Sequence, residues 1–276
     1  MSAPAAEPEP DAPDPVFQSH LPFAPWADPA ARRLPGVMPL DPGDWLGVDD
    51  AYAGQMTLRD RLIAGRPWAM HALLPEGRAA ADELLTLVLD RELPRLGFTA
   101  EGSVLRRPDG VPVRPDPAAP LLTLGRLVQE DFCLMQPGPE GEHILTGAIL
   151  CFPAGWTLAE KLGRPLTRIH APVAKYDAEV ARRVRRLFDL VQPGRPLWRA
   201  NAHRSAAPLH NPRPEGTAAY GGGTPPPFVR SERQCILRLP ETGAVVISIH
   251  TWLVRAASLT PAQAEALDAH PIHSAA

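Results

Sequence analysis

The sequence predicts an α+β fold with a sheet of predominantly antiparallel neighbours. Apolar residues recur at helical spacing in three segments, about 78–96, 177–191 and 261–269. Strand-like runs lie in the middle and at the end of the chain, at 143–152, 234–239 and 244–254. Helices and a hairpin separate these strands, a distribution that favours α+β over a regular alternation of strands and helices.

The N-terminal region divides into two segments. Residues 1–16 consist almost entirely of Ala, Pro, Glu and Asp, which predicts a disordered Pro/Ala/acidic tail. Between 17 and 45 prolines alternate with large apolar residues, which predicts an extended arm packed onto the body of the protein. We expect residues 17–269 to form a single domain and 270–276 to fray.

Local signals define the next elements. The helix over 78–96 places leucines on one stripe and is followed by Gly97. The pair Asp109-Gly110, flanked by short strand-like runs, predicts a tight β-hairpin. Helical spacing of Leu124, Leu127, Val128 and Leu134 predicts a helix over 121–135.

Further elements follow in the second half of the chain. Thr157 and Glu160 form a capping pattern that predicts a short helix over 157–162. The helix over 177–191 has four arginines on its outer side, which form either a solvated face or a binding patch. Residues 193–228 are rich in Pro, Gly, Asn and His and predict a long irregular stretch.

Composition excludes several functional classes. The formal charge is -3, from 28 basic and 31 acidic residues, so no strong field would attract nucleic acid or an anionic membrane. Three cysteines with no paired spacing read as reduced, buried thiols. The sequence has no apolar run of transmembrane length and no secretory signal pattern, so we expect a cytoplasmic protein.

The common catalytic motifs are absent from the sequence, including G-x-S-x-G, G-x-x-x-x-G-K, H-E-x-x-H and G-x-G-x-x-G. Hydrolase, nucleotidase and dehydrogenase interpretations therefore lose their simplest support. The run Gly221-Gly222-Gly223 precedes prolines instead of a helix start, so it lacks the amide cradle that a phosphate needs.

Histidines and arginines provide the remaining candidates. His170 lies in an apolar segment and is either a core histidine bonded to a backbone carbonyl or a metal ligand. His203 and His210 lack the spacing of a metal site on one helix. Near residues 228–240, Arg230, Glu232, Arg233 and Arg238 form either an internal ion-pair network or a site for carboxylates.

Four segments together resemble the heme-dependent oxidative N-demethylase family, in its alpha-subunit-like form, and they occur in order between about residues 20 and 260. They are LVQEDFCLM (127–135), AILCFPAGWTLAEKLGRPLTRIHAPV (148–173), RAN (199–201) and RSERQCILRLPETGAVVISIHTWL (230–253). The resemblance implies a PAS-like sheet with a heme b pocket. It also implies oxygen-dependent demethylation of a small methylated amine, with electrons from a partner reductase subunit that carries flavin and an iron-sulfur cluster.

The same resemblance suggests roles for individual residues. His170, in the IHAPV motif, is the expected axial ligand of the heme iron. Arg230 and Arg233, with Arg199 and Asn201, are expected to hold the heme propionates or to order the distal pocket. Glu232 and Arg233 are the catalytic candidates, and Glu232 is suited to bind the substrate ammonium or to relay protons.

This chain departs from the family pattern at several positions. Ala202 stands where Trp is usual, Ala174 replaces Pro, and His250-Thr251-Trp252 replaces Arg-Thr-Tyr. His250 is therefore either a core histidine, an iron ligand or a proton shuttle. Two other functions remain open: a PAS-like heme sensor or small-ligand module without turnover, and an inactive partner of a reductase complex.

Overall fold

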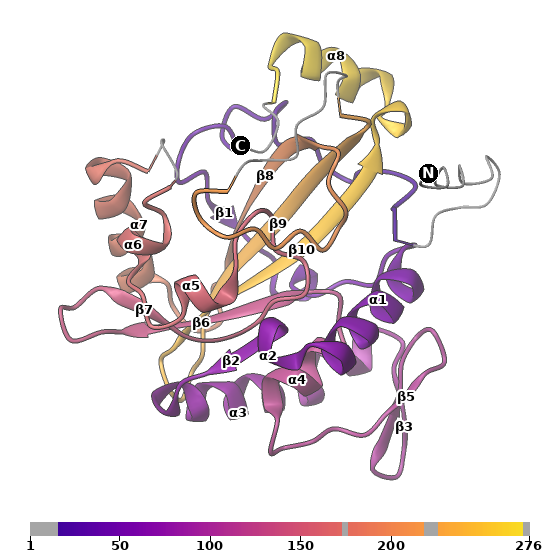
Figure 1. Ribbon diagram of the computed structural model, residues 1–276, viewed down its shortest axis with the longest axis vertical. Coiled ribbons are helices and arrows are strands. Elements are labelled where there is room, and N and C mark those ends of the chain that lie inside the picture. The colour runs from indigo at the N-terminus through magenta and orange to yellow at the C-terminus, as the bar shows by residue number, and fades with distance from the viewer. Residues whose placement is uncertain (1–15, 173–175, 218–225, 273–276) are drawn as a thin grey trace, which may run out of the picture.

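A computed structural model (Figure 1) describes residues 16–172, 176–217 and 226–272 and has an α+β fold. The described residues form a seven-stranded sheet flanked by helices and a separate three-stranded sheet. The fold class predicted from the sequence is therefore confirmed. Ala174, the glycine run 221–223 and nearly all of the predicted tail lie outside the described residues, as do the last four residues of the C-terminus.

Every neighbouring pair of strands in the large sheet is antiparallel. The five central strands follow the order β7-β6-β10-β9-β8, and the helices α5 to α7 lie between β7 and β8 in the chain. This arrangement is compatible with the expected PAS-like sheet. From one edge to the other the strands are β1 (Met38–Pro39), β8 (Leu197–Ser205), β9 (Phe228–Arg238), β10 (Val245–Arg255), β6 (Asp131–Pro137), β7 (His143–Ile149) and β2 (His71–Leu73).

The large sheet has two chemically different faces because side chains alternate along each strand. Along β8, Leu197, Arg199 and Asn201 share what we call the front face. Trp198 and Ala200 lie on the rear face. The register of β8 with β9 places Asn201 opposite Glu232, and Ala200 opposite Arg233. Adjacent residues of β9 therefore point to opposite sides of the sheet.

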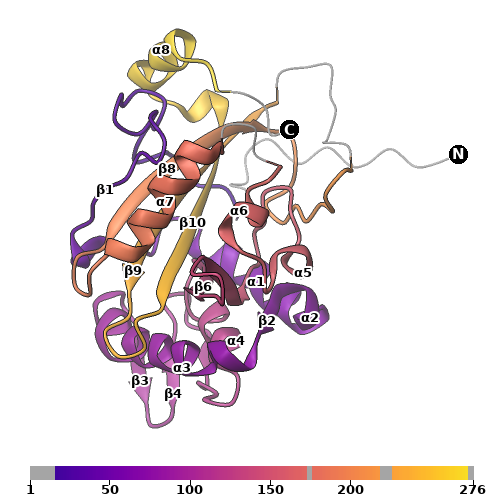
Figure 2. The same cartoon turned by 90° about the vertical axis from the view of Figure 1, so that its left-hand side faces the viewer.

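Three helices pack over part of the front face: α5 (Leu158–Lys161), α6 (Leu166–Ile169) and α7 (Ala178–Leu190). Figure 2 shows α7 lying across the strands β8 to β10. Asp177 caps α7 by accepting hydrogen bonds from the amides of Glu179 and Val180. Phe188 of α7 and Leu166 of α6 share one buried cluster with Ile236 of β9, so these helices are fixed to the sheet.

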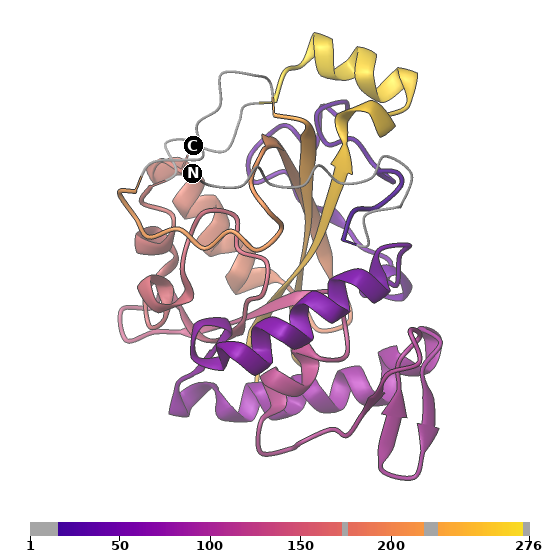
Figure 3. The same cartoon turned by 45° about the vertical axis from the view of Figure 1, so that its right-hand side comes forward.

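The rear face is covered by a second group of helices: α1 (Tyr52–Gly65), α2 (Pro67–Met70), α3 (Arg78–Leu87) and α4 (Pro120–Gly125) (Figure 3). The helical turns continue after α3 through a π-helical turn, Val88–Glu92, and a 3-10 turn, Leu93–Arg95, as the sequence pattern predicts. Leu84 and Leu124 from these helices pack with Phe132 of β6 in the main core.

The N-terminal arm packs on the rear face, as the prolines and apolar residues predict. Leu21, Trp26, Leu40 and Trp45 of this arm are buried. Helix α8 (Pro261–Ala269) starts with a capping box between Thr260 and Gln263 and packs against the arm. The arm and the C-terminal helix therefore stabilise each other beside the sheet.

The smaller sheet confirms the hairpin prediction. Its strands are β3 (Thr99–Glu101), β4 (Val104–Arg106) and β5 (Pro112–Val113). Gly110, in the turn between β4 and β5, has φ of +83°, a conformation that glycine adopts without strain.

Two of the sequence predictions are wrong. The helix expected over 121–135 ends at Gly125, and Asp131–Pro137 forms β6. Residues 131–135 are buried because other elements cover both faces of this strand. Their continuous apolar run therefore contains the spacing expected of a helix. The stretch 193–228 is also not irregular throughout, because Leu197–Ser205 forms β8. Helix α1 had no sequence prediction.

The cysteines confirm the prediction of reduced, buried thiols: Cys133, Cys151 and Cys235 are free and buried. Burial raises the pKa of Cys133 to about 12, so this thiol stays protonated at neutral pH. Every helix within the described residues is too short or too polar to span a lipid bilayer.

Candidate functional site

Polar side chains of β8 and β9 gather on the front face of the large sheet, beside the part that α7 covers. In the register of the two strands, each of these residues of β8 lies opposite one of β9. We call this group the front polar patch, and it consists of Arg199, Asn201 and His203 from β8 with Arg230, Glu232 and Gln234 from β9. His203 was not assigned from the sequence, but the period-two alternation in Arg199-Ala200-Asn201-Ala202-His203 is a strand signal that places it with the others.

Glu232 occupies the centre of the front polar patch. Its carboxylate accepts a hydrogen bond from Nε of Arg230 at 3.1 Å and one from Nδ2 of Asn201 at 3.4 Å. The side chain is 10% exposed, so it is largely desolvated but still in reach of a small molecule. Oδ1 of Asn201 is buried and has no hydrogen-bond partner among the described residues.

Arg230 is buried and links three segments of the chain. Its Nη1 donates to the carbonyl of Leu209 at 2.8 Å, and its Nη2 donates to the carbonyl of Phe152 at 2.5 Å. With the ion pair to Glu232, these bonds tie β9 to the segments that follow β7 and β8. The geometry gives Arg230 a structural role and leaves Arg199 as the more available cation of the patch.

Arg199 extends from β8 beside this centre. It donates from Nε to the carbonyl of Pro35 at 3.0 Å and from Nη1 to Oε1 of Gln234 at 2.6 Å. Burial lowers the pKa of Arg199, and the nearby charge of Glu232 opposes that shift. No carboxylate within the described ranges forms a salt bridge with Arg199, so its charge is available to an anionic ligand.

His170 lies at the C-terminal end of α6, on the front side of the sheet. Its Nδ1 is 2.9 Å from the carbonyl of Leu166, which can only accept, so the proton belongs on Nδ1. Burial lowers the pKa of His170, and the charges of Arg199 and Lys161 lower it further. The ring also stacks on Tyr176 at 4.5 Å between centroids. His170 is therefore a neutral, oriented imidazole with a lone pair on Nε2.

These features fit a heme. A heme iron takes a neutral imidazole nitrogen, and a backbone carbonyl bonded to the other nitrogen fixes the tautomer. Arg199 supplies a cation for a propionate, whereas the unused atom of Asn201, Oδ1, is an acceptor and does not suit an ionised carboxylate. No group of three or more His, Cys, Asp or Glu that could hold a metal ion occurs in the described part of the chain, and a heme needs no such group.

The structure does not bring Arg233 into this site. Arg233 lies on the rear face, where its Nη2 donates to the carbonyl of Trp45 at 3.1 Å and its guanidinium lies 5.6 Å from the ring centroid of Trp252. Glu232 and Arg233, the two catalytic candidates, are therefore separated by the sheet. His170, Arg199, Asn201, Arg230 and Glu232 share its front side.

His250 also lies on the rear face, and both of its ring nitrogens are engaged. Nδ1 is 2.9 Å from Oε1 of Glu130, and Nε2 is 3.0 Å from Oδ2 of Asp49. Burial favours a lower pKa for His250, but the charge of Glu130 and the bond to Asp49 outweigh burial and raise it. The geometry favours the core-histidine interpretation, as an imidazolium between two carboxylates.

Glu130 and Asp131 are adjacent in the chain but point in different directions. Glu130 faces His250, whereas Asp131 forms a buried salt bridge with Arg59 of α1 at 2.7 Å. Both carboxylates therefore have structural roles. No sequence pattern indicates Asp49 or Arg59 as partners, because Arg59 lies 72 residues from Asp131 and Asp49 lies 201 residues from His250.

A comparison with protein-family models agrees with the resemblance in the sequence. The model of the family described as "Haem-dependent oxidative N-demethylase, alpha subunit-like" matches residues 36–270. This range includes the front polar patch, His170 and all strands of the large sheet. The description indicates heme dependence and a multi-subunit enzyme. The chain belongs to the heme-dependent oxidative N-demethylase alpha-subunit-like family.

Proposed function

We propose that this chain is the heme-binding subunit of an oxidoreductase that removes a methyl group from a small methylated amine. The observation that carries the proposal is His170, a neutral and oriented imidazole beside the polar patch of a chain that matches the N-demethylase family. Heme b is the proposed cofactor. Electrons come from a partner reductase subunit with flavin and an iron-sulfur cluster.

The overall reaction balances as follows. The methyl carbon leaves as formaldehyde with one oxygen atom of O2, and the amine keeps a hydrogen in its place. The other oxygen atom leaves as water, and two electrons and two protons complete the reaction. When bound, the heme supplies oxygen activation, which amino-acid side chains cannot provide.

The residues of the chain have separate tasks in this proposal. His170 binds the iron through Nε2 while Nδ1 stays bonded to Leu166. Arg199 pairs with a propionate. Glu232 binds the substrate ammonium, and Asn201 orients the Glu232 carboxylate through their hydrogen bond. Arg230 holds Glu232 in position through the buried salt bridge.

Turnover is the test of this proposal. The chain is reconstituted with hemin, reduced chemically and mixed with oxygen and dimethylamine or trimethylamine, and formaldehyde is quantified. Formaldehyde above that of free hemin supports the oxidase. Bound heme that takes up gas reversibly without formaldehyde supports the sensor alternative, and failure to bind heme supports an inactive structural partner.

Glu232→Gln is expected to raise KM for the amine about tenfold or more while heme loading stays unchanged. The amide keeps an acceptor for Arg230 but loses the charge that attracts an ammonium. Glu179→Gln, on the exposed side of α7, is the matched control and should leave KM unaltered. An unchanged KM in the Glu232 variant would remove this residue from the substrate site.

A further inference from the structure

A cavity lies on the rear face of the sheet, away from the front polar patch. It has a volume of about 380 Å³, which is within the usual size range of small-ligand sites. The N-terminal arm forms one wall and the strands β8 and β9 form the other. Its lining includes Phe23, Leu40, Asp41, Asp44, Trp198 and Arg233.

Arg233 is the cation of this cavity, and its hydrogen-bonding capacity is only partly used. Its Nη2 donates to the carbonyl of Trp45, but its Nε is buried and has no partner among the described residues. The salt bridges found within those residues do not include Arg233. A guanidinium that lines a cavity and has no carboxylate partner among these residues is suited to bind a carboxylate ligand.

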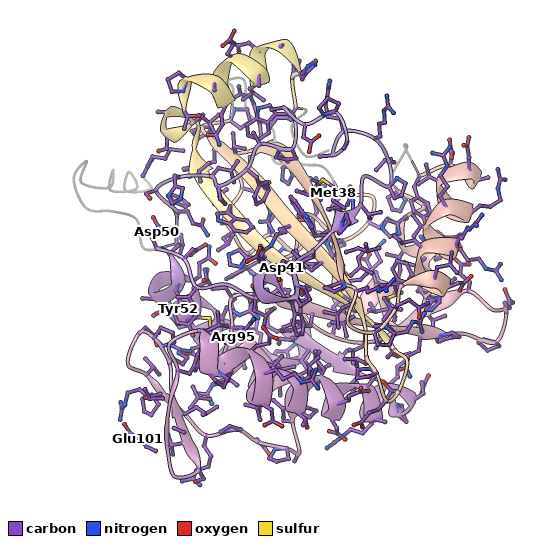
Figure 4. The ribbon with its side chains drawn as sticks, turned by 180° about the vertical axis from the view of Figure 1, so that it is seen from behind. Met38, Asp41, Asp50, Tyr52, Arg95 and Glu101 are labelled. Carbon is purple, nitrogen blue, oxygen red and sulfur yellow. The ribbon has the colours of Figure 1, made fainter. Side chains whose placement is uncertain are left out.

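Part of the rim of the cavity is acidic. Asp41 precedes and caps the 3-10 turn Pro42–Asp44 of the arm, and Asp44 is the last residue of this turn. Figure 4 shows Asp41 and Arg95 on this side of the molecule. Arg95 does not neutralise the rim, because its Nη2 bonds to Glu92 at 2.5 Å and to the carbonyl of Gly43. The two rim carboxylates disfavour a dianion such as phosphate and favour a cationic group.

Apolar side chains line the rest of the cavity. Phe23 contacts Trp198 edge to face, with 5.8 Å between ring centroids, and Leu40 and Leu46 complete the wall. A ligand that complements the cation, the carboxylates and the apolar wall of the cavity has a carboxylate, an ammonium and an apolar body. Free amino acids with apolar or aromatic side chains combine these three groups.

We propose that the rear cavity binds a free apolar amino acid, with its carboxylate on Arg233, its ammonium at Asp41 and Asp44, and its side chain against Trp198 and Phe23. The site is separate from the front polar patch and does not depend on the proposed oxidase activity. The sheet between the two sites carries Glu232 on one side and Arg233 on the other.

Calorimetric titration of the full chain with three related probes tests the proposal. L-phenylalanine carries both charged groups, 3-phenylpropionate lacks the ammonium, and phenethylamine lacks the carboxylate. We expect saturable binding of L-phenylalanine, at least about tenfold tighter than that of either analogue. Equal affinity for 3-phenylpropionate, or no binding of L-phenylalanine at millimolar concentration, overturns the proposal.

Variants assign the binding to this cavity. Arg233→Gln should weaken L-phenylalanine binding about tenfold or more. Asp44→Asn, on an exposed turn where misfolding is not a concern, should reduce the preference for L-phenylalanine over 3-phenylpropionate. Arg95→Gln is the control at the same rim and should bind like the parent chain. Unchanged binding in both the Arg233 and the Asp44 variants contradicts the proposed site.

Discussion

Arg59→Met is expected to destabilise the protein by about 3–5 kcal/mol, because it leaves the buried carboxylate of Asp131 without its counter-charge. Arg59 is fully buried and donates to Asp131, to the carbonyls of Gln129 and Glu130, and to that of Gly125. It therefore connects α1 to the end of α4 and to the start of β6.

Asp131 has further partners that make the loss of Arg59 more severe. Its two carboxylate oxygens accept hydrogen bonds from the amides of Cys151 and Phe152, just after β7, at 2.7 and 2.8 Å. An unpaired charge at this position loosens the ends of two central strands. Chemical and thermal unfolding measure the effect, and the midpoint should fall by roughly 10 °C.

Arg183→Met is the matched control for this prediction. Arg183 forms an exposed pair with Glu179 one turn away on α7, and both side chains are more than half exposed. Pairs of this kind contribute about 0.3–0.5 kcal/mol. A loss in Arg59→Met no larger than that in Arg183→Met would show that the buried network does not hold the sheet and α1 together.

The second large effect is a dependence of stability on pH through His250. The imidazolium donates to Glu130 and to Asp49, so it joins the start of β6 to the segment before α1. A neutral imidazole has only one N–H and would face one of the two carboxylates with a lone pair. Deprotonation in the folded protein therefore weakens the contact between β10 and this segment.

The direction of the effect follows from the raised pKa of His250. Because the folded state binds the proton more tightly than the unfolded chain, the contribution is complete below pH about 6.5 and disappears as the pH rises through the folded pKa. The free energy of unfolding should fall by up to about 1.4 kcal/mol per pH unit in this range. Burial acts to raise the pKa of Asp49, but the hydrogen bonds that Asp49 makes with His250 and other neighbouring side chains lower it to about 2. The contribution of Asp49 to stability is therefore lost only in strong acid.

His250→Gln tests this interpretation, since glutamine cannot titrate. The free energy of unfolding of the parent chain should exceed that of the variant most below pH 6.5, and the difference should shrink toward pH 9. His20→Gln, at an exposed histidine, should follow the parent chain throughout. A difference between parent and His250 variant that is constant from pH 5 to pH 9 would mean that His250 is not charged in the fold.

The elements predicted correctly are those whose signals are local. In α7 the apolar positions recur at helical spacing and Asp177 caps the first turn. The hairpin follows from the backbone preference of Asp109-Gly110. The helix predicted over 121–135 is wrong because β6 is covered on both faces. A continuous apolar run contains helical spacing as well as strand spacing.

Other features depend on contacts between distant residues. Helix α1 buries Gln55 and Arg59 on its inner side, so a search for apolar periodicity does not find it. Strand β8 carries Arg199, Asn201 and His203 on one face, and this polar composition is also typical of a loop. Strand alternation places Glu232 and Arg233 on opposite faces, but the strand predicted from the sequence begins at residue 234, whereas β9 begins at Phe228. The sequence prediction therefore did not separate the two residues.

Heme binding by His170 is the central claim, and a hemin titration followed by absorption spectroscopy tests it most directly. The parent chain should give a Soret band that saturates at one heme per chain. His170→Gly should lose the band and regain it with added imidazole, and His203→Ala, a histidine of the same patch, should keep it. A colourless parent chain, an unchanged spectrum in the His170 variant, or loss of the band only in the His203 variant would contradict the account.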